Sequence, residues 1–266
     1  MRRSAAILAV VAAVSLAACS SSTGGAPTTS APAPSSTSSS MAASGSITVF
    51  AASSLKGSFA EIATAFEAAN PGTTVTYNFG PSSGLATQIT QGAPADVFAA
   101  ASTKTMDTVT TAGAASNPQV FATNTMEIAT PASGGASVMS LADLATAGVK
   151  VAVCQKDVPC GVAAQKLFDQ NKVTVTPSTE EVDVKAVLSK VELGEVDAGI
   201  VYVTDVKAAG DKVKGIEIPA DQNVTTKYPI APIGASKNAA TAQAFVDFVL
   251  SPAGQSILAG AGFAAP

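Results

Sequence analysis

The fold is decided by residues 46–79, which read SITVFAASSLKGSFAEIATAFEAANPGTTVTYNF. The β-branched run Ile47–Phe50 predicts a buried strand, and the apolar residues that recur at helical spacing between Leu55 and Ala69 predict a helix. Residues 70–72, Asn-Pro-Gly, end that helix, and residues 74–79 read as a second strand. This order of strand, helix and strand predicts two parallel strands covered by a helix.

The same alternation continues along the chain. Further helices are expected at 83–91, 161–170 and 184–193, and further strands at 96–100, 149–154, 173–175 and 198–203. We therefore expect an α/β fold of two lobes with a cleft between them. Residues 46–124 plus 230–266 would form the first lobe and residues 125–229 the second, with hinges near residues 124–126 and 226–230.

The composition excludes several classes of function. The 266 residues are 47% hydrophobic and 13% charged, which is enough apolar material for a sizeable core. There is no histidine, so Ser-His-Asp and Cys-His catalysis and the common zinc sites are excluded. Beyond Arg2 and Arg3 the chain has 13 Lys against 19 Asp plus Glu. Such an acidic chain argues against nucleic acid, and any bound anion must be held without arginine.

The N-terminus predicts an export signal and a membrane tether. Residues 1–18 have the form of a signal peptide, with Arg2 and Arg3 before an apolar run. The run ends in Leu-Ala-Ala-Cys, which resembles a lipobox. We therefore expect Cys19 to become the lipid-modified, palmitate-bearing first residue of the mature chain. An ordinary signal peptide followed by an incidental cysteine is the alternative.

Residues 19–45 read as a linker that starts at the lipidated cysteine. After Cys19 they are almost entirely Ser, Thr, Gly, Ala and Pro, a composition that cannot bury a core and predicts disorder. Flexible-chain scaling would hold the folded part on the order of 25–30 Å from the membrane. We therefore expect the protein to work outside the cytoplasm, anchored to the cell membrane through Cys19.

Two further cysteines, Cys154 and Cys160, are separated by five residues. In an oxidising compartment an even number of cysteines at this spacing predicts a disulfide. Two reactive thiols are the other interpretation, although the chain has no histidine to activate them.

Four predicted strand-to-helix junctions carry residues that suit an anion: Ser53-Ser54, Pro81–Gly84, Val158–Gly161 and Val182–Val184. Ligands of open α/β sheets gather beyond the carboxyl ends of strands, where unpaired amides at helix N-termini bind oxyanions without a formal cation. Serine hydroxyls and the phenol of Tyr202 would add donors. Each residue alone has a plainer interpretation, since Ser54 or Ser82 most often caps a helix and Tyr202 most often sits half-buried on a strand.

Gly80–Gly84 also matches G-x-S-x-G, the nucleophile elbow of serine hydrolases, between a predicted strand and a predicted helix. Ser82 would then be a nucleophile. The usual general base is missing because the chain has no histidine. A Ser-Lys pair stays open, although no lysine lies close in sequence to these serines. We therefore expect a carrier and not an enzyme.

Several motifs, in order and without gaps, resemble those of one known family. They are VFAASSL at 49–55, FGPSSGLA at 79–86, QGAPADVF at 91–98, and GIVY at 199–202 followed by Thr204-Asp205. They are similar to motifs of the periplasmic molybdate-binding proteins of ABC transporters, the ModA family. The likeness runs from Ile47 to Gly262-Phe263, essentially the whole folded part.

The resemblance implies a two-lobed type II periplasmic-binding-protein fold that closes on one tetrahedral dianion. The matching positions place the oxyanion contacts on Ser54 and Ser82 in the first lobe and on Cys160, Val184 and Tyr202 in the second. The donors would be the hydroxyls of the serines and the tyrosine, together with backbone N–H groups at helix starts.

Two residues depart from the family pattern. Cys160 stands where many members have Ala, which matters little if the contact is made by its backbone amide. A Cys154–Cys160 bridge would then pin the loop that presents this amide. Pro81 replaces a residue with an N–H group, so one donor beside Ser82 is lost.

The expected donors agree with the implied ligand. Molybdate and tungstate carry no proton at neutral pH, so they suit a site made of donors alone. Hydrogen phosphate would need an acceptor for its proton, and Asp183 is the only acid in the four junction motifs. Sulfate also lacks a proton, so its exclusion would depend on the size of the cavity.

These observations predict an extracytoplasmic lipoprotein, monomeric and without a cofactor, that captures molybdate and delivers it to an ABC permease. Molybdenum would be bound only as the oxyanion, with no direct ligand from the protein to the metal. Three alternatives stay open: a binding protein of the same fold for tungstate or sulfate, a secreted serine hydrolase that uses Ser82, and a surface interaction protein whose cleft binds nothing.

Overall fold

The computed structural model describes residues 43–266, which lie within one compact unit of residues 41–266. The predicted signal peptide at residues 1–18, the predicted lipidation at Cys19 and most of the predicted linker lie outside the described residues. Among residues 43–266, no helix is both long enough and apolar enough to cross a membrane.

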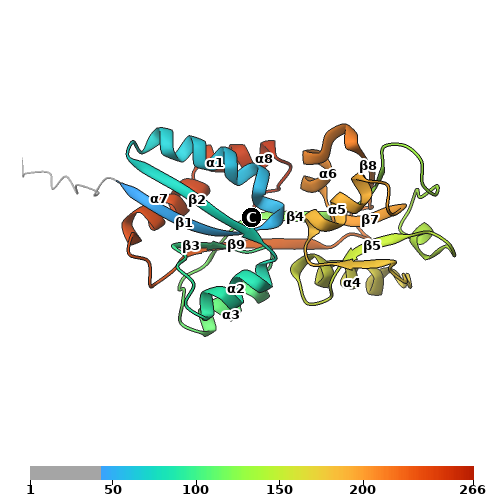
Figure 1. Cartoon of the computed structure of the whole chain (residues 1–266), viewed down its shortest axis with the longest axis horizontal. Coiled ribbons are helices and arrows are strands. Elements are labelled where there is room, and N and C mark those ends of the chain that lie inside the picture. The colour runs from blue at the N-terminus through green and yellow to red at the C-terminus, as the bar shows by residue number, and fades with distance from the viewer. Residues whose placement is uncertain (1–42) are drawn as a thin grey trace, which may run out of the picture. The chain divides into compact units, whose positions relative to one another are not determined.

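The first lobe is built on strands β1 (Gly45–Ala52), β2 (Thr73–Gly80) and β3 (Val97–Ala99), which run parallel. A further strand, β9 (Thr225–Pro232), joins β3 antiparallel. Two layers of helices cover this sheet (Figure 1). They are α1 (Lys56–Ala69), α7 (Ala239–Leu250) and α8 (Pro252–Gly260) on one face, and α2 (Ser82–Thr90) and α3 (Thr103–Thr111) on the other.

The alternation of side chains along β1 explains the two layers. Ile47, Val49 and Ala51 are buried in the core shared with α1, α7 and α8, whereas Phe50 is buried in the core shared with α2 and α3. Successive residues of a strand point to opposite faces, so a strand covered on both sides must be apolar throughout. Burial of a side chain as large as Phe59, which is fully buried on α1, stabilises the fold by about 1.5–3 kcal/mol.

The second lobe is built like the first, from parallel strands covered by helices. Strands β5 (Val151–Cys154), β6 (Thr179–Glu181) and β7 (Ala198–Tyr202) run parallel. Strand β8 (Val213–Glu217) pairs with β4 (Gln119–Pro131) and not with the three parallel strands. The helices are α4 (Pro159–Asn171), α5 (Val184–Glu192) and α6 (Val203–Ala209), and 3-10 turns occupy Ala142–Ala145 and Gly210–Lys212. The buried residues of this lobe form a separate core between Met126 and Val224.

One long strand, β4 (Gln119–Pro131), belongs to both lobes. Residues 119–125 pair antiparallel with β9, and residues 126–131 pair antiparallel with β7 and β8. The continuous sheet therefore runs β2-β1-β3-β9-β4-β7-β5-β6, with β8 added beside β4. β4 changes partner at residues 125 and 126. The lobe boundary and the hinge expected near these residues stay predictions.

Two expectations about strands need correction. The alternating pattern predicted parallel sheets, but β4, β8 and β9 are antiparallel to their neighbours. The strand expected at 173–175 is wrong, because that segment has no strand pairing and β6 lies at Thr179–Glu181 instead. Val173 and Val175 do pack against the core, although the hydrogen bonds to β5 form farther along the chain.

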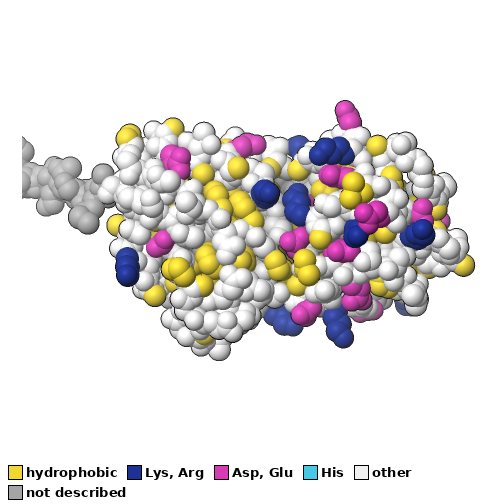
Figure 2. Space-filling model, viewed as in Figure 1, with side chains coloured by type: hydrophobic (Ala, Val, Ile, Leu, Met, Phe, Trp, Pro, Cys, Tyr) yellow, Lys and Arg dark blue, Asp and Glu magenta, His cyan; other side chains and the backbone are white. Residues whose placement is uncertain are grey.

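The visible surface agrees with the acidic composition. Figure 2 shows Lys side chains interspersed with Asp and Glu side chains, mostly over the second lobe, and no continuous basic stripe on this face. A surface of this kind does not suit the phosphate backbone of a nucleic acid.

Candidate functional site

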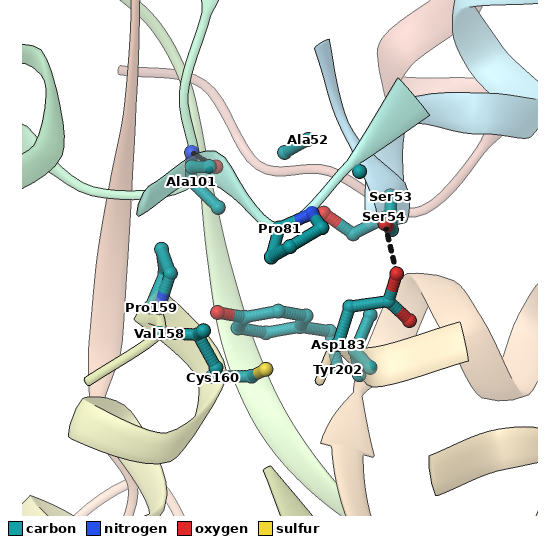
Figure 3. A pocket seen from close by; sticks show the side chains of 13 residues that line it. Ala52, Ser53, Ser54, Pro81, Ala101, Val158, Pro159, Cys160, Asp183 and Tyr202 are labelled. Atoms are coloured by element: carbon teal, nitrogen blue, oxygen red, sulfur yellow. Dashed lines mark hydrogen bonds between the residues drawn. The ribbon is translucent and has the colours of Figure 1, made fainter. Parts of the chain in front are cut away.

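A small pocket lies between the two lobes, where the structure brings together all five residues expected to contact an oxyanion (Figure 3). They are Ser54, Ser82, Cys160, Val184 and Tyr202. About 20 Å³ of the pocket can hold the centre of a water-sized sphere. One water needs roughly 10–15 Å³ by the same measure, so the space suits a ligand only a little larger than water.

Three helices begin at the pocket. Ser82 is the first residue of α2, Cys160 is the second of α4, and Val184 is the first of α5. No side chain caps α2 or α4, so their first-turn amides find no acceptor on a capping side chain. Helix N-termini carry a partial positive charge, and three of them converging on one space attract an anion without any cationic side chain.

Ser82 is oriented by the backbone of a neighbouring strand end. Its side chain is buried, and its Oγ accepts a hydrogen bond from the N–H of Ala101 at 3.1 Å. An oxygen that accepts in this way keeps its own hydrogen free to donate. Ala101, which also lines the pocket, lies just past β3 and carries no side-chain signal that sequence reasoning could have used.

Ser54 lies in the 3-10 turn Ser53–Leu55, and its Oγ is 3.0 Å from the hydroxyl of Tyr228 on β9. Tyr228 is fully buried, and burial raises its pKa above the ordinary value, although the hydrogen bond to Ser54 opposes this. Tyr228 therefore keeps its proton and can donate to Ser54, which leaves the hydrogen of Ser54 free for a ligand. Sequence reasoning missed Tyr228, because 174 residues separate the pair.

Tyr202 ends β7, and its ring reaches into the space between Pro81 and Cys160 (Figure 3). The side chain is 1% exposed, and its hydroxyl makes no hydrogen bond within residues 43–266. Burial first, and then nearby Tyr228, raise the pKa of Tyr202 well above its ordinary value, so the group is a neutral O–H. An unpaired buried hydroxyl costs about 1–3 kcal/mol, a cost that an accepting ligand would remove.

An ion pair between the partly exposed Lys185 and the buried Asp205 holds the backbone of Tyr202 in place. Asp205 is fully buried on α6; its Oδ2 accepts from the N–H of Tyr202 at 3.1 Å, and its Oδ1 lies 2.8 Å from Nζ of Lys185. Burial raises the pKa of Asp205 and Lys185 opposes that shift. Since a buried carboxylate needs a partner, Lys185 is expected to keep Asp205 ionised and accepting.

The start of α4 is fastened to the end of β5 in two ways. Cys154 and Cys160 are joined by a disulfide, with their Cα atoms 5.7 Å apart. Next to it, a Cβ on Gly161 would overlap the carbonyl oxygen of Gln155, so only glycine lets the two backbone segments approach this closely. The amides of the first turn of α4 are therefore presented by a rigid segment.

Of the described residues that line the pocket, Asp183 is the only charged one. Its Oδ1 accepts from the N–H of Ala186 at 3.0 Å, which caps α5, and its Oδ2 accepts from Oγ of Ser53 at 2.7 Å. This second hydrogen bond crosses from one lobe to the other (Figure 3). Within residues 43–266, no lysine lines the pocket beside Ser82. Within residues 43–266, no group of three or more His, Cys, Asp and Glu side chains forms a metal site.

Comparison with known proteins identifies the family. The model of the bacterial extracellular solute-binding protein family matches residues 47–264. The molybdate-binding protein ModA of Mycobacterium tuberculosis (strain H37Rv) is 45% identical over 222 residues, which cover 83% of this chain and 85% of that protein. The molybdate-binding protein ModA of Escherichia coli K12 is 31% identical over 237 residues, covering 84% and 90%.

Solved structures show the same fold. The periplasmic molybdate-binding protein of Azotobacter vinelandii superposes with a TM-score of 0.72 at 21% identity, covering 83% of this chain and 99% of that one. The sulfate-binding protein SubI of Mycobacterium tuberculosis superposes with a TM-score of 0.74 at 19% identity, covering 82% and 86%.

The family comprises solute-binding proteins that act outside the cytoplasm, and these relatives are named as binding proteins, so the expectations of an extracytoplasmic carrier and not an enzyme are confirmed. The chain belongs to the bacterial extracellular solute-binding protein family and, within it, to the ModA proteins.

Proposed function

We propose that the protein captures one molybdate dianion in the pocket between its lobes and delivers it to an ABC permease. The observation that carries this proposal is the hydroxyl of Tyr202, which is buried, lines the pocket and has no partner among the described residues. The 45% identical relative is named for molybdate binding, which supports the same ligand here.

The polarity of the pocket favours an oxyanion without a proton. Ser54, Ser82 and Tyr202 each have a hydroxyl hydrogen available, and the first amides of α2, α4 and α5 add donors. Neutral dipoles that act together make a buried dianion tolerable without a counter-charge. Molybdate accepts at all four oxygens and donates at none, so it matches such a set of groups.

The size of the pocket favours a single tetrahedral ion. A sphere of 20 Å³ has a radius of about 1.7 Å. Four oxygens around one central atom suit so small a space better than a larger organic anion does. Tungstate has the same shape as molybdate and is the second candidate, and sulfate is the third because a sulfate-binding protein shares the fold.

We further infer that the protein is a monomer without a cofactor and that the mature chain is tethered through a lipidated Cys19. Residues 46–124 plus 230–266 and residues 125–229 would be the two bodies that close on the ion, and closure would be the state that the permease recognises. Incorporation of labelled palmitate into the wild-type chain, and its loss in Cys19→Ala, would support the tether. Equal labelling of both chains would contradict it.

Calorimetric titration of residues 20–266 with molybdate, tungstate, sulfate and phosphate tests the ligand. We expect one-to-one binding of molybdate and tungstate, with sulfate and phosphate much weaker. Ser82→Ala should weaken molybdate binding about tenfold or more, since the lost hydroxyl donates to a charged ligand. Preference for sulfate would assign the protein to a different uptake system, and no heat with any of the four ions would contradict oxyanion binding.

A further inference from the structure

The carboxylate of Asp183 is unexpected in a pocket that is proposed to bind a dianion. Every other polar group that lines this pocket is neutral, and a carboxylate contributes negative charge and acceptor capacity. A carboxylate acceptor is the group that a protonated oxyanion needs, because such an ion has one hydrogen to donate. The donors that hydrogen-bond to the carboxylate of Asp183 therefore decide which anions the pocket binds.

Both oxygens of Asp183 are engaged by donors of the protein. Oδ1 accepts a hydrogen bond from the N–H of Ala186 at the start of α5, and Oδ2 accepts one from the hydroxyl of Ser53 at 2.7 Å. The second donor is the decisive one, because it comes from the opposite lobe and from a residue that also lines the pocket. Ser53 is 7% exposed, so little water is at hand to replace its hydroxyl.

We infer that Ser53 is a specificity-determining residue. By donating to Oδ2 of Asp183 it occupies one of the acceptor sites of that oxygen and holds the carboxylate toward the opposite lobe, which makes it a poorer acceptor for the hydrogen of hydrogen phosphate or hydrogen arsenate. The O–H of an ion of that kind then forms a weaker hydrogen bond, which weakens binding on the order of tenfold. Molybdate, tungstate and sulfate carry no hydrogen at neutral pH, so their binding does not depend on this acceptor. This role rests on the proposed binding of a small tetrahedral oxyanion.

The inference predicts a change of selectivity in Ser53→Ala. Removal of the hydroxyl leaves Oδ2 beside the pocket without its donor, and the hydrogen of a bound hydrogen phosphate can then replace it. Closure of the lobes also loses one hydrogen bond, so all anions should bind somewhat more weakly. The informative quantity is therefore the ratio of two affinities measured on the same variant.

The test is calorimetric titration of residues 20–266, wild type and Ser53→Ala, with molybdate, sulfate and phosphate at neutral pH. We expect the phosphate-to-molybdate affinity ratio to rise about tenfold or more in Ser53→Ala, while the sulfate-to-molybdate ratio stays as in the wild type. Sulfate is the internal control, because a pocket that has merely loosened would admit sulfate and phosphate alike. An unchanged phosphate ratio, or an equal rise for sulfate, would overturn the inference.

Three further variants keep the result interpretable. Ser53→Thr retains the hydroxyl and should keep the wild-type ratios. The double variant with Ser53→Ala and Asp183→Asn keeps an oxygen that can cap α5 but has no carboxylate. The rise in the phosphate-to-molybdate affinity ratio should therefore disappear. Ser83→Ala removes a serine of α2 that does not line the pocket and should leave all affinities unchanged.

The two hypotheses fail in different ways. If the wild type binds molybdate and Ser53→Ala shows no gain for phosphate, only the role of Ser53 is wrong. If the wild type binds none of the anions, the proposed function is wrong and the role of Ser53 is lost with it.

Discussion

The hydroxyl of Tyr228 lies 3.0 Å from Oγ of Ser54 and connects β9 to the 3-10 turn that precedes α1. Tyr228 belongs to β9, which pairs with β4 over the segment where β4 leaves the first lobe. Both hydroxyls are buried, so neither can exchange this partner for bulk water. The geometry makes Tyr228 a positioning residue that sets the direction in which Ser54 donates.

Tyr228→Phe should therefore weaken molybdate binding about tenfold, although Tyr228 does not line the pocket. Without the phenol, Ser54 has no donor to accept from and loses its orientation. Titration calorimetry of the variant measures the effect, and Ser54→Ala in the same background should add little, because the two residues act as one unit.

Tyr77→Phe is the matched control for this variant. Tyr77 is half-buried and donates to the carbonyl oxygen of Phe59 at 2.7 Å, but it packs against the first-lobe core and does not line the pocket. Its loss should lower the free energy of unfolding by about 1 kcal/mol and leave affinity unchanged. Equal losses of affinity in Tyr77→Phe and Tyr228→Phe would mean that Tyr228 acts through general stability alone.

Tyr202→Phe should separate stability from binding. The hydroxyl of Tyr202 makes no hydrogen bond in the described chain, so its removal should not lower the melting temperature of the ligand-free protein and should raise it slightly. Molybdate binding should fall at least tenfold, because a donor to the ion is lost. Thermal unfolding with and without molybdate shows both effects. A destabilised ligand-free variant with unchanged affinity would contradict the assigned role.

The disulfide should matter to affinity as well as to stability. A bridge that closes so short a loop stabilises the fold by about 2 kcal/mol, and it also holds the first turn of α4 against β5. Replacement of Cys154 and Cys160 by Ser should speed the dissociation of molybdate severalfold. A count of free thiols on the unreduced wild type comes first, and two free thiols would show that the bridge is absent.

Gly161→Ala tests the same segment without altering the cysteines. The added Cβ meets the backbone of Gln155 and Cys154, which cannot move away as a flexible side chain would. We expect a loss of stability of at least 2 kcal/mol together with weaker binding. Gly57→Ala is the control, because a Cβ there meets nothing, and Ala favours a helix over Gly by about 1 kcal/mol.

All three tyrosines should resist ionisation until the protein unfolds. Burial raises the pKa of Tyr77, Tyr202 and Tyr228 above the ordinary value. A pKa that is higher in the folded state contributes stability below the unfolded pKa of about 10, and this contribution is lost as the pH rises above it. Since the chain has no Trp, tyrosinate absorbance is easily followed. It should appear in one cooperative step with unfolding, and gradual titration centred near pH 10 would contradict this.

Lys185→Met should destabilise the protein through Asp205. The variant leaves a fully buried carboxylate without its cation, which we expect to cost about 2–3 kcal/mol because Lys185 itself is partly exposed. Burial already raises the pKa of Asp205, so the lost stability should return as the pH falls and Asp205 takes up a proton. Denaturant unfolding at several pH values measures this, and Asp205→Asn in the Lys185→Met background should recover stability at neutral pH.

Local patterns were sufficient for most of the elements. The run Ile47–Phe50, the apolar spacing of α1 and the stop at Asn70-Pro71-Gly72 are decided by neighbours in sequence, and the structure places β1, α1 and β2 there. β4 and β9 could not be found in this way. Their pairing joins residues about 100 positions apart, and β4 changes partner in mid-strand while the strand itself continues.

The sequence by itself determined the two-lobed class, the helix starts that line the cleft and the residue types offered there, because capping, periodicity and motif spacing are local properties. Only the tertiary structure decided how those residues are used. It directs Tyr228 to Ser54 and Ser53 to Asp183, and it leaves the hydroxyl of Tyr202 without a partner in the part of the chain that the structure describes. These relationships depend on contacts between segments 130 and 174 residues apart, and such contacts exist only after both lobes have packed.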